Sequence, residues 1–506
     1  MHRPNSFIRE IDSLVAAIAG FLLIYIWTRH SGIGVSPDSI VYMSTAANIR
    51  HHGVINDFTG MPMMDFPAGY PVFLSLVMLV TGLEPMQFAP LLNGLLFAGL
   101  IFLSGWIMER FSYPSRWYKW AILSIIVLSP CLLEIYSMLW SETLFLILTL
   151  VFFLAARRYH LTHSWKGVVL MGAIAAVAGV IRYAGISLIL LGGFLMITDL
   201  KTSWKKKLWH MLAFGMIGVS LIVLNVYRNR LVTGTLTGYR EKAVTGLGSN
   251  LKHLGNVFCD WLPFFDDPYK YPALVGVVCL LICIAAWLYR LIRQHDEYSY
   301  DQIATAHFIV YALFMLIVSS ISRFQTLDSR LLSPLFISWI WGSSSWILPQ
   351  FRRAGKKVRA GLAVLGLGAA ACMLYGQLVL YKFNWEGIKF AGIPGYTEDQ
   401  WTGSQTMDFI RHSPELHRPG VSIYSNAFEG IWFLTGVVSD LIPHKDLPWD
   451  VKDMMKEDHF YIIWFDDATN ADLLSIETIG QTKHKEKEYH FNDGAVYYFT
   501  TTPEAH

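Results

Sequence analysis

Residues 36–71 read SPDSIVYMSTAANIRHHGVINDFTGMPMMDFPAGYP and follow the first long apolar segment of the chain. Ser36 can cap a helix, Pro37 suits the first helical position, and Asp38 in the first turn faces the positive end of the helix dipole. Tyr42 lies four residues after Asp38 and therefore shares its face of the helix. The stretch predicts a polar helix that presents a carboxylate and a phenol on one side.

The remainder of this stretch leads back toward the hydrophobic part of the chain. It contains Asp65 and the run FPAGYP, whose prolines and glycine end any helix there. Residues 70–81, YPVFLSLVMLVT, begin with Tyr70 and are apolar, but they are too few to cross a bilayer, which takes about 20 residues. We therefore expect an interfacial or re-entrant helix, and residues 36–81 form one elaborate outer loop.

The composition identifies the class of protein. Of the 506 residues, 54% are hydrophobic and 15% are charged, and the mean hydropathy is +0.39. These values exclude a soluble enzyme with one core and predict a mainly α, polytopic membrane protein. The net charge is +2, and the basic residues form short scattered clusters, so no nucleic-acid partner is expected. The five cysteines show no spacing typical of metal ligands or disulfides, which indicates packing roles.

Apolar runs separated by charged clusters predict about eleven membrane spans. They cover residues 11–29, 86–108, 118–133, 140–156, 166–182, 184–199, 208–227, 271–290, 304–321, 331–349 and 360–381. With these spans, the basic clusters at 110–119, 157–166, 201–207, 290–293 and 352–359 all fall on the side of the N-terminus. The positive-inside rule makes that side cytoplasmic.

The composition changes after residue 381. Apolar runs become shorter, charges increase, and the segments VSIYSNAFEGIWFLTG, HFYIIWFDD and AVYYFTT have the character of strands. We expect a membrane-embedded module over residues 1–381 and a small extracytoplasmic α/β domain over residues 382–506.

Polar and ionisable residues collect where the predicted spans meet the outer side. They are Asp38, Tyr42, Asp65, Tyr70, Glu142, Arg182, Tyr183, Arg228, Arg230 and Arg330. Ionisable groups at membrane depth are costly, so their convergence at one face favours a functional site. A carboxylate can take a proton from a hydroxyl nucleophile, and arginines can hold a phosphate through paired hydrogen bonds.

Each of these residues also has a structural explanation. Asp38 taken alone is better explained as an acid that stabilises a helix start. For Glu142, this structural role and a functional role explain the residue equally well. The tyrosines suit a membrane interface, and Arg228 and Arg230 suit contacts with lipid headgroups. Arg182 is the hardest to explain this way, because it ends a span on the side that has few basic residues.

The order of several short motifs resembles a known family. These motifs are the first-loop Asp38 with Tyr42, then FPAGYP, Ser-Glu opening a span, Arg-Tyr-Ala-Gly, Arg-Leu-Leu-Ser-Pro, and IYSNAFEGIWFLTG near the end. Together they resemble the GT-C glycosyltransferases, in particular bacterial relatives of protein O-mannosyltransferases and lipid A aminoarabinose transferases. The resemblance implies an inverting membrane glycosyltransferase of the bacterial inner membrane that moves a hexose or pentose from a polyprenyl-phosphate carrier on the extracytoplasmic face.

The resemblance also implies roles for individual residues. Asp38 matches the family's catalytic base, and Arg182 and Arg330 match basic positions near the carrier phosphate. The chain departs from the family at Ser39, where protein mannosyltransferases have a Glu, and at Phe66, where aminoarabinose transferases have a Lys. These departures leave open the identity of the sugar and of the acceptor, which is a lipid, glycan or protein.

A mechanism follows from the charges. Asp38 would deprotonate the acceptor hydroxyl while the arginines stabilise the departing phosphate, and the reaction would then need no metal or other cofactor. A non-catalytic assembly scaffold could share this topology, and only loss of function at Asp38 would separate it from an enzyme. Two further classes of function remain open on the sequence. One is a transporter or lipid flippase, which should show related halves or charges at mid-membrane. The other is an O-antigen ligase or polymerase, which we expect to place its large outer loop between late spans.

Overall fold

The computed structural model describes residues 6–238, 243, 245–262, 269–293, 298–322, 326–418, 420–468 and 470–501. By packing, the chain divides into two compact units. Unit 1 comprises Met1–Arg29 and Met64–Gly387, and unit 2 comprises His30–Met63 and Ile388–His506. The first outer loop is thus shared between the units, with residues 36–63 in unit 2 and 64–81 in unit 1. The domain division expected at residue 381 stays a prediction.

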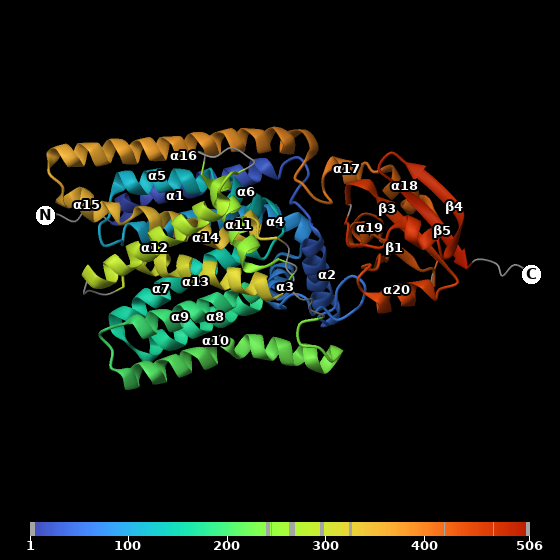
Figure 1. Ribbon diagram of the computed structural model, residues 1–506, viewed down its shortest axis with the longest axis horizontal. Helices are drawn as coiled ribbons and strands as arrows, with labels where there is room; N and C mark the ends of the chain where they lie inside the picture. Colours follow the sequence, from blue (N-terminus) through green and yellow to red (C-terminus); the bar gives the residue numbers. More distant parts are fainter. Residues whose placement is uncertain are drawn as a thin grey trace, which may run out of the picture. The chain divides into compact units, whose positions relative to one another are not determined.

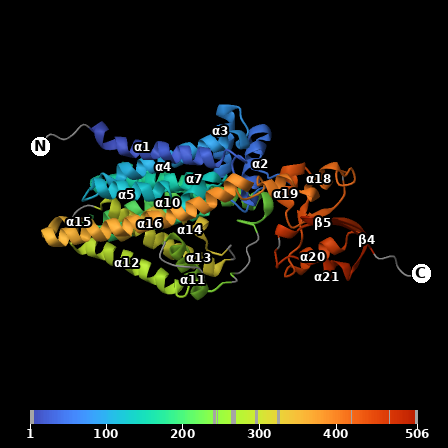
Figure 2. The same ribbon diagram turned by 90° about the horizontal axis from the view of Figure 1, so that it is seen from above.

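Unit 1 is a bundle of helices that lie lengthwise beside one another (Figures 1 and 2). Its helices are α1 (Ser6–Trp27), α3 (Gly69–Thr81), α4 (Pro85–Met108), α5 (Arg116–Val127), α6 (Pro130–Ser137), α7 (Glu142–Thr162), α8 (Trp165–Ile181), the 3-10 turn η1 (Tyr183–Gly185), α9 (Ile186–Thr198), α10 (Trp204–Thr233), α11 (Leu247–Trp261), α12 (Pro272–Arg293), α13 (Tyr300–Ile321), α14 (Ser329–Ser344), α15 (Ile347–Arg353) and α16 (Lys356–Ala391), whose last residues belong to unit 2.

Each predicted span corresponds to helical structure. Among the described residues, eight helices are long and apolar enough to cross a membrane, and the bent pair α5 and α6 makes a ninth if it counts as one span. Helices α8 and α9, which cover the spans predicted at 166–182 and 184–199, are shorter apolar helices, as is α3. The mainly α, polytopic membrane architecture is therefore confirmed, and the run at 70–81 lies in the short helix α3, which has 13 residues.

The break between α8 and α9 arises from the Arg-Tyr-Ala-Gly sequence. Arg182 ends α8 in an extended conformation, with φ −146° and ψ 138°, and its N–H still bonds to the carbonyl of Ala178 at 3.0 Å. The 3-10 turn that follows brings Gly185 against Ala178, where a Cβ atom would lie 2.4 Å from the Ala178 carbonyl oxygen. The glycine therefore lets the chain turn tightly and leaves the Arg182 side chain at the helix end.

Unit 2 contains a five-stranded sheet in the order β2-β1-β3-β5-β4. The strands are β1 (Ile423–Ser425), β2 (Asp440–Leu441), β3 (His459–Phe465), β4 (Lys483–Phe491) and β5 (Gly494–Thr501). β1 pairs in parallel with β2 and β3, whereas β5 is antiparallel to β3 and β4. Its helices are α2 (Pro37–His52), α17 (Asp399–Thr402), α18 (Gln405–His412), α19 (Phe428–Thr435), α20 (Pro448–Met455), the 3-10 turn η2 (Asp466–Ala468) and α21 (Ile476–Gly480).

The small sheet confirms two of the three predicted strands and corrects the third. HFYIIWF forms β3 and AVYYFTT lies in β5, and their alternate residues Phe460, Ile462 and Phe499 are fully buried in one core. The segment predicted as the strand VSIYSNAFEGIWFLTG is a strand only at Ile423–Ser425, and its apolar remainder is helix α19. Such short apolar runs do not distinguish a strand from a buried helix by pattern alone.

Helix α2 and the segment before it are integral parts of unit 2. The helix starts where Pro37 and the Ser36 cap predict, and Gly53 ends it at φ 70°. Before it, the Tyr396 N–H donates to the Val35 carbonyl at 2.8 Å. Helix α2 packs on α19, so the predicted polar helix is held by elements from the opposite end of the sequence.

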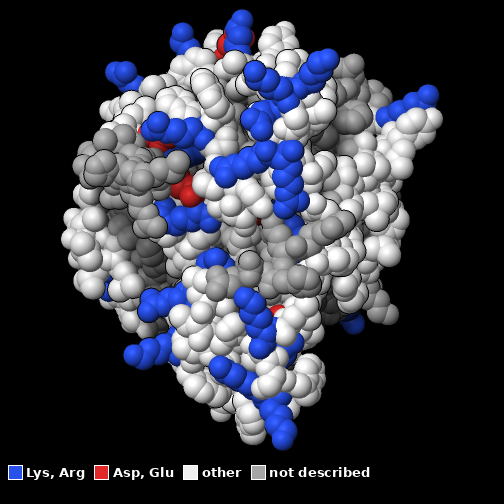
Figure 3. All heavy atoms as spheres, turned by 90° about the vertical axis from the view of Figure 1, so that its left-hand side faces the viewer, with Lys and Arg blue, Asp and Glu red and all other residues white. Residues whose placement is uncertain are grey.

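Lys and Arg side chains gather on one face of the molecule, where few acidic side chains are visible (Figure 3). The exposed residues of the predicted basic clusters are Arg110, Arg116, Arg158, Lys166, Lys201, Lys205, Lys206, Arg352, Arg353, Lys356, Lys357 and Arg359. The asymmetry is the kind that orients multi-pass proteins. Which side of the membrane this face occupies stays a prediction.

Candidate functional site

A buried carboxylate holds two arginines together in unit 1. The side chain of Glu142 is only 1% exposed. Its Oε2 lies 2.6 Å from Nη1 of Arg182 and its Oε1 lies 2.7 Å from Nε of Arg330. The side chains of Arg182 and Arg330 are 14% and 13% exposed. Each carboxylate oxygen therefore fixes one arginine, and residues separated by up to 188 positions in sequence meet at one point. We call Glu142, Arg182 and Arg330 the arginine cluster.

Three helix ends place the arginine cluster. Glu142 occupies the first turn of α7, Arg182 is the last residue before η1, and Arg330 stands in the first turn of α14. The positive end of the α7 dipole favours an acid at its start. On α14, the Asp328 side chain accepts the Leu331 N–H at 2.8 Å, which fixes the turn that carries Arg330.

Neighbouring groups orient the guanidinium planes. The guanidinium carbon of Arg330 lies 3.8 Å from the centroid of the Trp140 ring, an arrangement that favours a cation over an aromatic face. Nη1 of Arg182 donates to the Ser141 hydroxyl at 3.0 Å. Burial raises the pKa of Asp328, which interacts with Arg330. Two fixed guanidinium groups against one fully buried carboxylate make this cluster suited to an anion such as a phosphate.

Three further predicted residues lie in unit 1. Tyr70 is fully buried in α3. The Tyr183 hydroxyl accepts from the Asn225 amide at 3.5 Å, and the same amide side chain accepts the Ala68 N–H at 3.1 Å, which links the Arg-Tyr-Ala-Gly turn to the FPAGYP run. Asp65 is exposed, and its Oδ1 packs against the backbone of Gly238, where a Cβ would lie 2.4 Å away.

Arg228 and Arg230 lie near the end of α10. Arg228 is half-buried and donates to the Asn229 side chain at 3.1 Å. Arg230 is exposed and donates to the carbonyl of Gly234, the residue that caps its own helix. The contact made by Arg230 is the one expected of a basic residue that stabilises a helix C-terminus.

Asp38 and Tyr42 belong to unit 2. Asp38 is half-buried in the first turn of α2, and Tyr42 is only 2% exposed one helical turn later. Asp38 and Tyr42 therefore lie four residues apart on one helix, as the sequence predicts. Their roles in chemistry stay predictions.

A second carboxylate, Glu429, faces the charge of Asp38. Glu429 opens α19, the helix on which α2 packs. Burial, with a further contribution from the charge of Asp38, raises the pKa of Glu429 to about 7. Sequence reasoning missed this residue, although it lies within the IYSNAFEGIWFLTG motif. The signal was an acid inside an otherwise apolar run.

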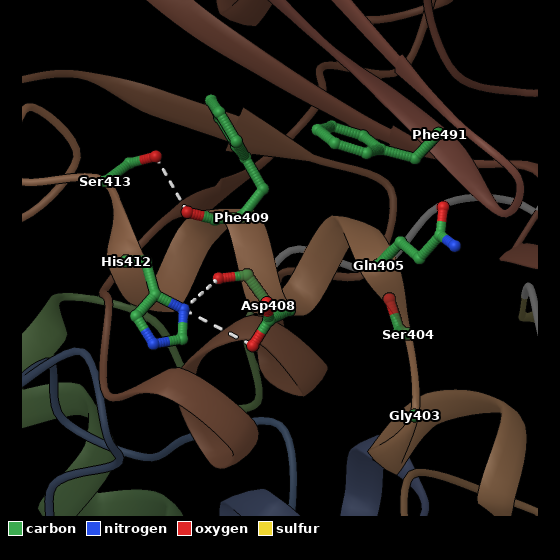
Figure 4. Close-up of a pocket in the computed structure, with 8 residues that line it drawn as sticks. All are labelled: Gly403, Ser404, Gln405, Asp408, Phe409, His412, Ser413 and Phe491. Carbon is green, nitrogen blue, oxygen red and sulfur yellow. Dashed lines mark hydrogen bonds and ion pairs between the residues drawn. The ribbon is translucent and has the colours of Figure 1, made fainter.

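Unit 2 also contains an open pocket on the surface of α18 (Figure 4). Its ionisable side chains, Asp408 and His412, approach one another at 3.3 Å one helical turn apart, and they are 64% and 71% exposed. An exposed pair at this spacing is common on helix surfaces. We assign the pocket no role.

Comparisons with known proteins bear on the fold. No protein-family model and no curated protein matches the sequence. Among solved structures, the chain is similar to ArnT from Cupriavidus metallidurans in the apo state, with a TM-score of 0.50 and 13% identity over 96% of this chain and 97% of that one.

An oligosaccharyltransferase from Archaeoglobus fulgidus gives a TM-score of 0.49 at 11% identity, over 86% of this chain and 64% of that one. Arabinosyltransferase EmbB from Mycobacterium smegmatis gives 0.38 at 16%, over 81% and 44%. The similarity to ArnT extends over nearly the full length of both chains, and it shows that this chain shares the fold of ArnT.

Proposed function

We propose that this chain, a multi-pass membrane protein with the GT-C fold, is an inverting glycosyltransferase that uses a polyprenyl-phosphate-linked hexose or pentose as donor. The observation that carries the proposal is the arginine cluster, in which Glu142 holds Arg182 and Arg330 side by side at 2.6 and 2.7 Å. The shared fold with ArnT, a glycosyltransferase, supports it. The acceptor is a hydroxyl group on a lipid, glycan or protein.

In the proposed step, an acceptor oxygen attacks the anomeric carbon and the bond from that carbon to the carrier phosphate breaks. Asp38 takes the acceptor's proton, and the phosphate leaves with the bonding electrons. Negative charge on the phosphate grows during this step, so guanidinium groups that are already fixed stabilise the transition state more than the ground state. We assign this role to Arg182 and Arg330, and a role in binding substrate to Tyr42, Tyr70, Asp65, Tyr183, Arg228 and Arg230.

Glu142 has a different role in this proposal. Because both of its oxygens are occupied by arginines, it acts as a positioning residue and not as the base. A carboxylate between two guanidinium groups reduces their repulsion and holds their planes without reorganisation during the reaction.

The proposal includes an orientation in the membrane. The N-terminus and the basic face would lie in the cytoplasm, and unit 2 would lie on the extracytoplasmic side.

The proposal is tested with the purified chain in nanodiscs and a panel of polyprenyl-phosphate sugars. Transfer and slow donor hydrolysis are measured together with donor binding. We expect Asp38→Asn to lower the turnover number by about 10²- to 10⁴-fold while donor binding stays near that of the wild type. Asp57→Asn is the matched control, because Asp57 accepts from the Thr59 N–H and hydroxyl in a turn of the same loop. Full turnover by Asp38→Asn would exclude Asp38 as the base, and failure of every donor to bind would contradict the donor class.

A further inference from the structure

Two histidines and one aspartate meet at the end of unit 1 opposite the start of α7. His160 lies in the last turn of α7, His163 is the C-cap residue of that helix, and Asp199 is the C-cap residue of α9. One ligand-type atom from each of the three lies within 4.8 Å of the others. We call these residues the histidine triad.

His160 is the most informative member. Its side chain is 1% exposed, and neither ring nitrogen has a hydrogen-bond partner within the described part of the chain. Nδ1 lies 3.8 Å from Oδ2 of Asp199, which is too long for a hydrogen bond. The rings of Tyr298 and Tyr159 pack against it at centroid distances of 4.4 and 5.2 Å. A buried imidazole whose nitrogens have no partner is unfavourable unless another group satisfies it.

The other two members point to the same position. Nε2 of His163 lies 2.7 Å from Oδ2 of Asp199. His163 has φ 46°, and it is the one non-glycine residue with positive φ among those that the structure describes. The Asp199 carboxylate also accepts from the Lys201 N–H at 2.9 Å and the Thr202 hydroxyl at 2.8 Å, so its orientation is fixed. His163 is 19% exposed and provides access from solvent.

We propose that the histidine triad binds one Zn²⁺ ion. Two imidazole nitrogens and one carboxylate oxygen are ligands that zinc prefers, at about 2.0–2.2 Å, which places ligand atoms about 3.3–3.5 Å apart in a tetrahedron. The observed Nδ1–Oδ2 and Nε2–Oδ2 separations of 3.8 and 2.7 Å lie on either side of that value. Small side-chain rotations therefore complete three positions of the tetrahedron, and water takes the fourth.

The proposed ion is separate from the transfer reaction. Residues 142 and 160 stand eighteen positions apart on α7, so the histidine triad lies about 27 Å along the helix from Glu142. An ion there would join the end of α7 to the end of α9, which bounds the connection into α10. The transfer reaction proposed above uses no metal, and an ion in the histidine triad would take no part in it.

The test measures metal directly. The full chain in nanodiscs is stripped with EDTA, incubated with ZnCl₂, passed through a desalting column and analysed for zinc by mass spectrometry. We expect one ion per chain in the wild type and zinc affinity at least about tenfold weaker in His160→Gln and Asp199→Asn, since each loses one ligand. Substitution with Co²⁺ should give the visible absorption of a four-coordinate site in the wild type alone.

His163→Asn keeps the test valid if a buried variant fails to fold. Asparagine tolerates the left-handed conformation of this C-cap residue but removes the imidazole, so the fold should persist while zinc is lost. His253→Gln, on α11 and outside the histidine triad, is the control that should retain zinc. Absence of zinc from the wild type, or its retention by all the triad variants, would overturn the proposal.

Discussion

Among single residues, Glu142 shows how one buried carboxylate can organise two arginines. Both of its oxygens are used at 2.6–2.7 Å, and the side chain is almost inaccessible to water. Removing one member of a buried ion pair typically costs about 3–5 kcal/mol, because the remaining charge is left uncompensated. Conservative substitutions that keep the charge are therefore the informative ones.

Arg182→Lys and Arg330→Lys test whether the arginines bind phosphate. Lysine keeps the charge opposite Glu142 but loses the planar, two-pronged donor that fits a phosphate. We expect each variant to raise the dissociation constant of a polyprenyl-phosphate sugar by about 10- to 100-fold, because hydrogen bonds to charged groups contribute about 1.5–3 kcal/mol. The measurement is donor binding in nanodiscs. Arg158→Lys on the basic face is the control, and unchanged binding in both cluster variants would contradict a phosphate role.

Glu429 predicts a pH dependence of stability. Its pKa is about 7 in the folded chain, compared with an ordinary value of 4.5. Between these values the folded state holds a proton that the unfolded state has released, so stability falls as the pH rises from about 4.5 to about 7. Glu429→Gln removes this loss and should stabilise the chain by about 1–3 kcal/mol at pH 8 but have little effect at pH 4.

Thermal unfolding of the wild type and Glu429→Gln at the two pH values measures this effect. Asp38→Asn should give part of the same stabilisation at pH 8, because it removes the negative charge that faces Glu429. Equal effects of Glu429→Gln at pH 4 and pH 8 would show that ionisation of Glu429 is not their cause.

Whole elements are positioned by close backbone contacts. Helix α3 approaches α8 at Gly69, where a Cβ would lie 2.5 Å from the Val180 carbonyl oxygen. This glycine belongs to the FPAGYP run, and the contact explains why a glycine stands there. The same packing carries the loop between Asp65 and Tyr70 to the end of α8 that bears Arg182 and Tyr183.

Gly69→Ala should therefore destabilise unit 1. One of the two backbones must move to admit the methyl group, and overpacking of this kind costs about 1–3 kcal/mol. Gly193→Ala in α9 is the matched control, since a Cβ there has nothing within 4 Å and alanine favours helix. Thermal unfolding in detergent compares the two. A Gly69→Ala variant as stable as Gly193→Ala would show that α3 and α8 are not packed this closely.

At the scale of the whole molecule, charge asymmetry predicts orientation. Lysine and arginine side chains gather on one face (Figure 3). Basic loops are retained in the cytoplasm. Because α16 begins at the basic cluster and is long enough to cross the membrane, we expect unit 2, including α2, on the extracytoplasmic side.

Cysteine labelling tests this orientation. In a Cys372→Ser background, which removes the one exposed native thiol among the described cysteines, Lys485→Cys on β4 should react with a membrane-impermeant maleimide in intact spheroplasts. Lys201→Cys, in the basic connection after α9, should react only after the membrane is permeabilised. Both positions are exposed in the structure. The reverse pattern of labelling would invert the proposed topology.

Local sequence patterns were enough to predict the class of protein, the positions of the apolar helices and the candidate polar residues. Long apolar runs must form helices in lipid because every backbone polar group needs a partner there, so this signal is local and strong. The start of α2 at Ser36 and Pro37 was also predictable, because capping depends on adjacent residues. The GT-C resemblance came from the order of short motifs.

Which of these residues meet depends on the packing of the helices. Glu142, Arg182 and Arg330 are far apart in sequence, and their contact depends on how α7, α8 and α14 pack. The edge strand β4, with its charged sequence KHKEKEYHF, was missed because its residues are mostly exposed and carry no apolar alternation. Glu429 and the histidine triad were missed because their surroundings come from elements that are distant in sequence. Burial and long-range contacts determine the pKa of Glu429 and bring the triad side chains together. Neither burial nor long-range contact can be predicted from the residues adjacent in sequence.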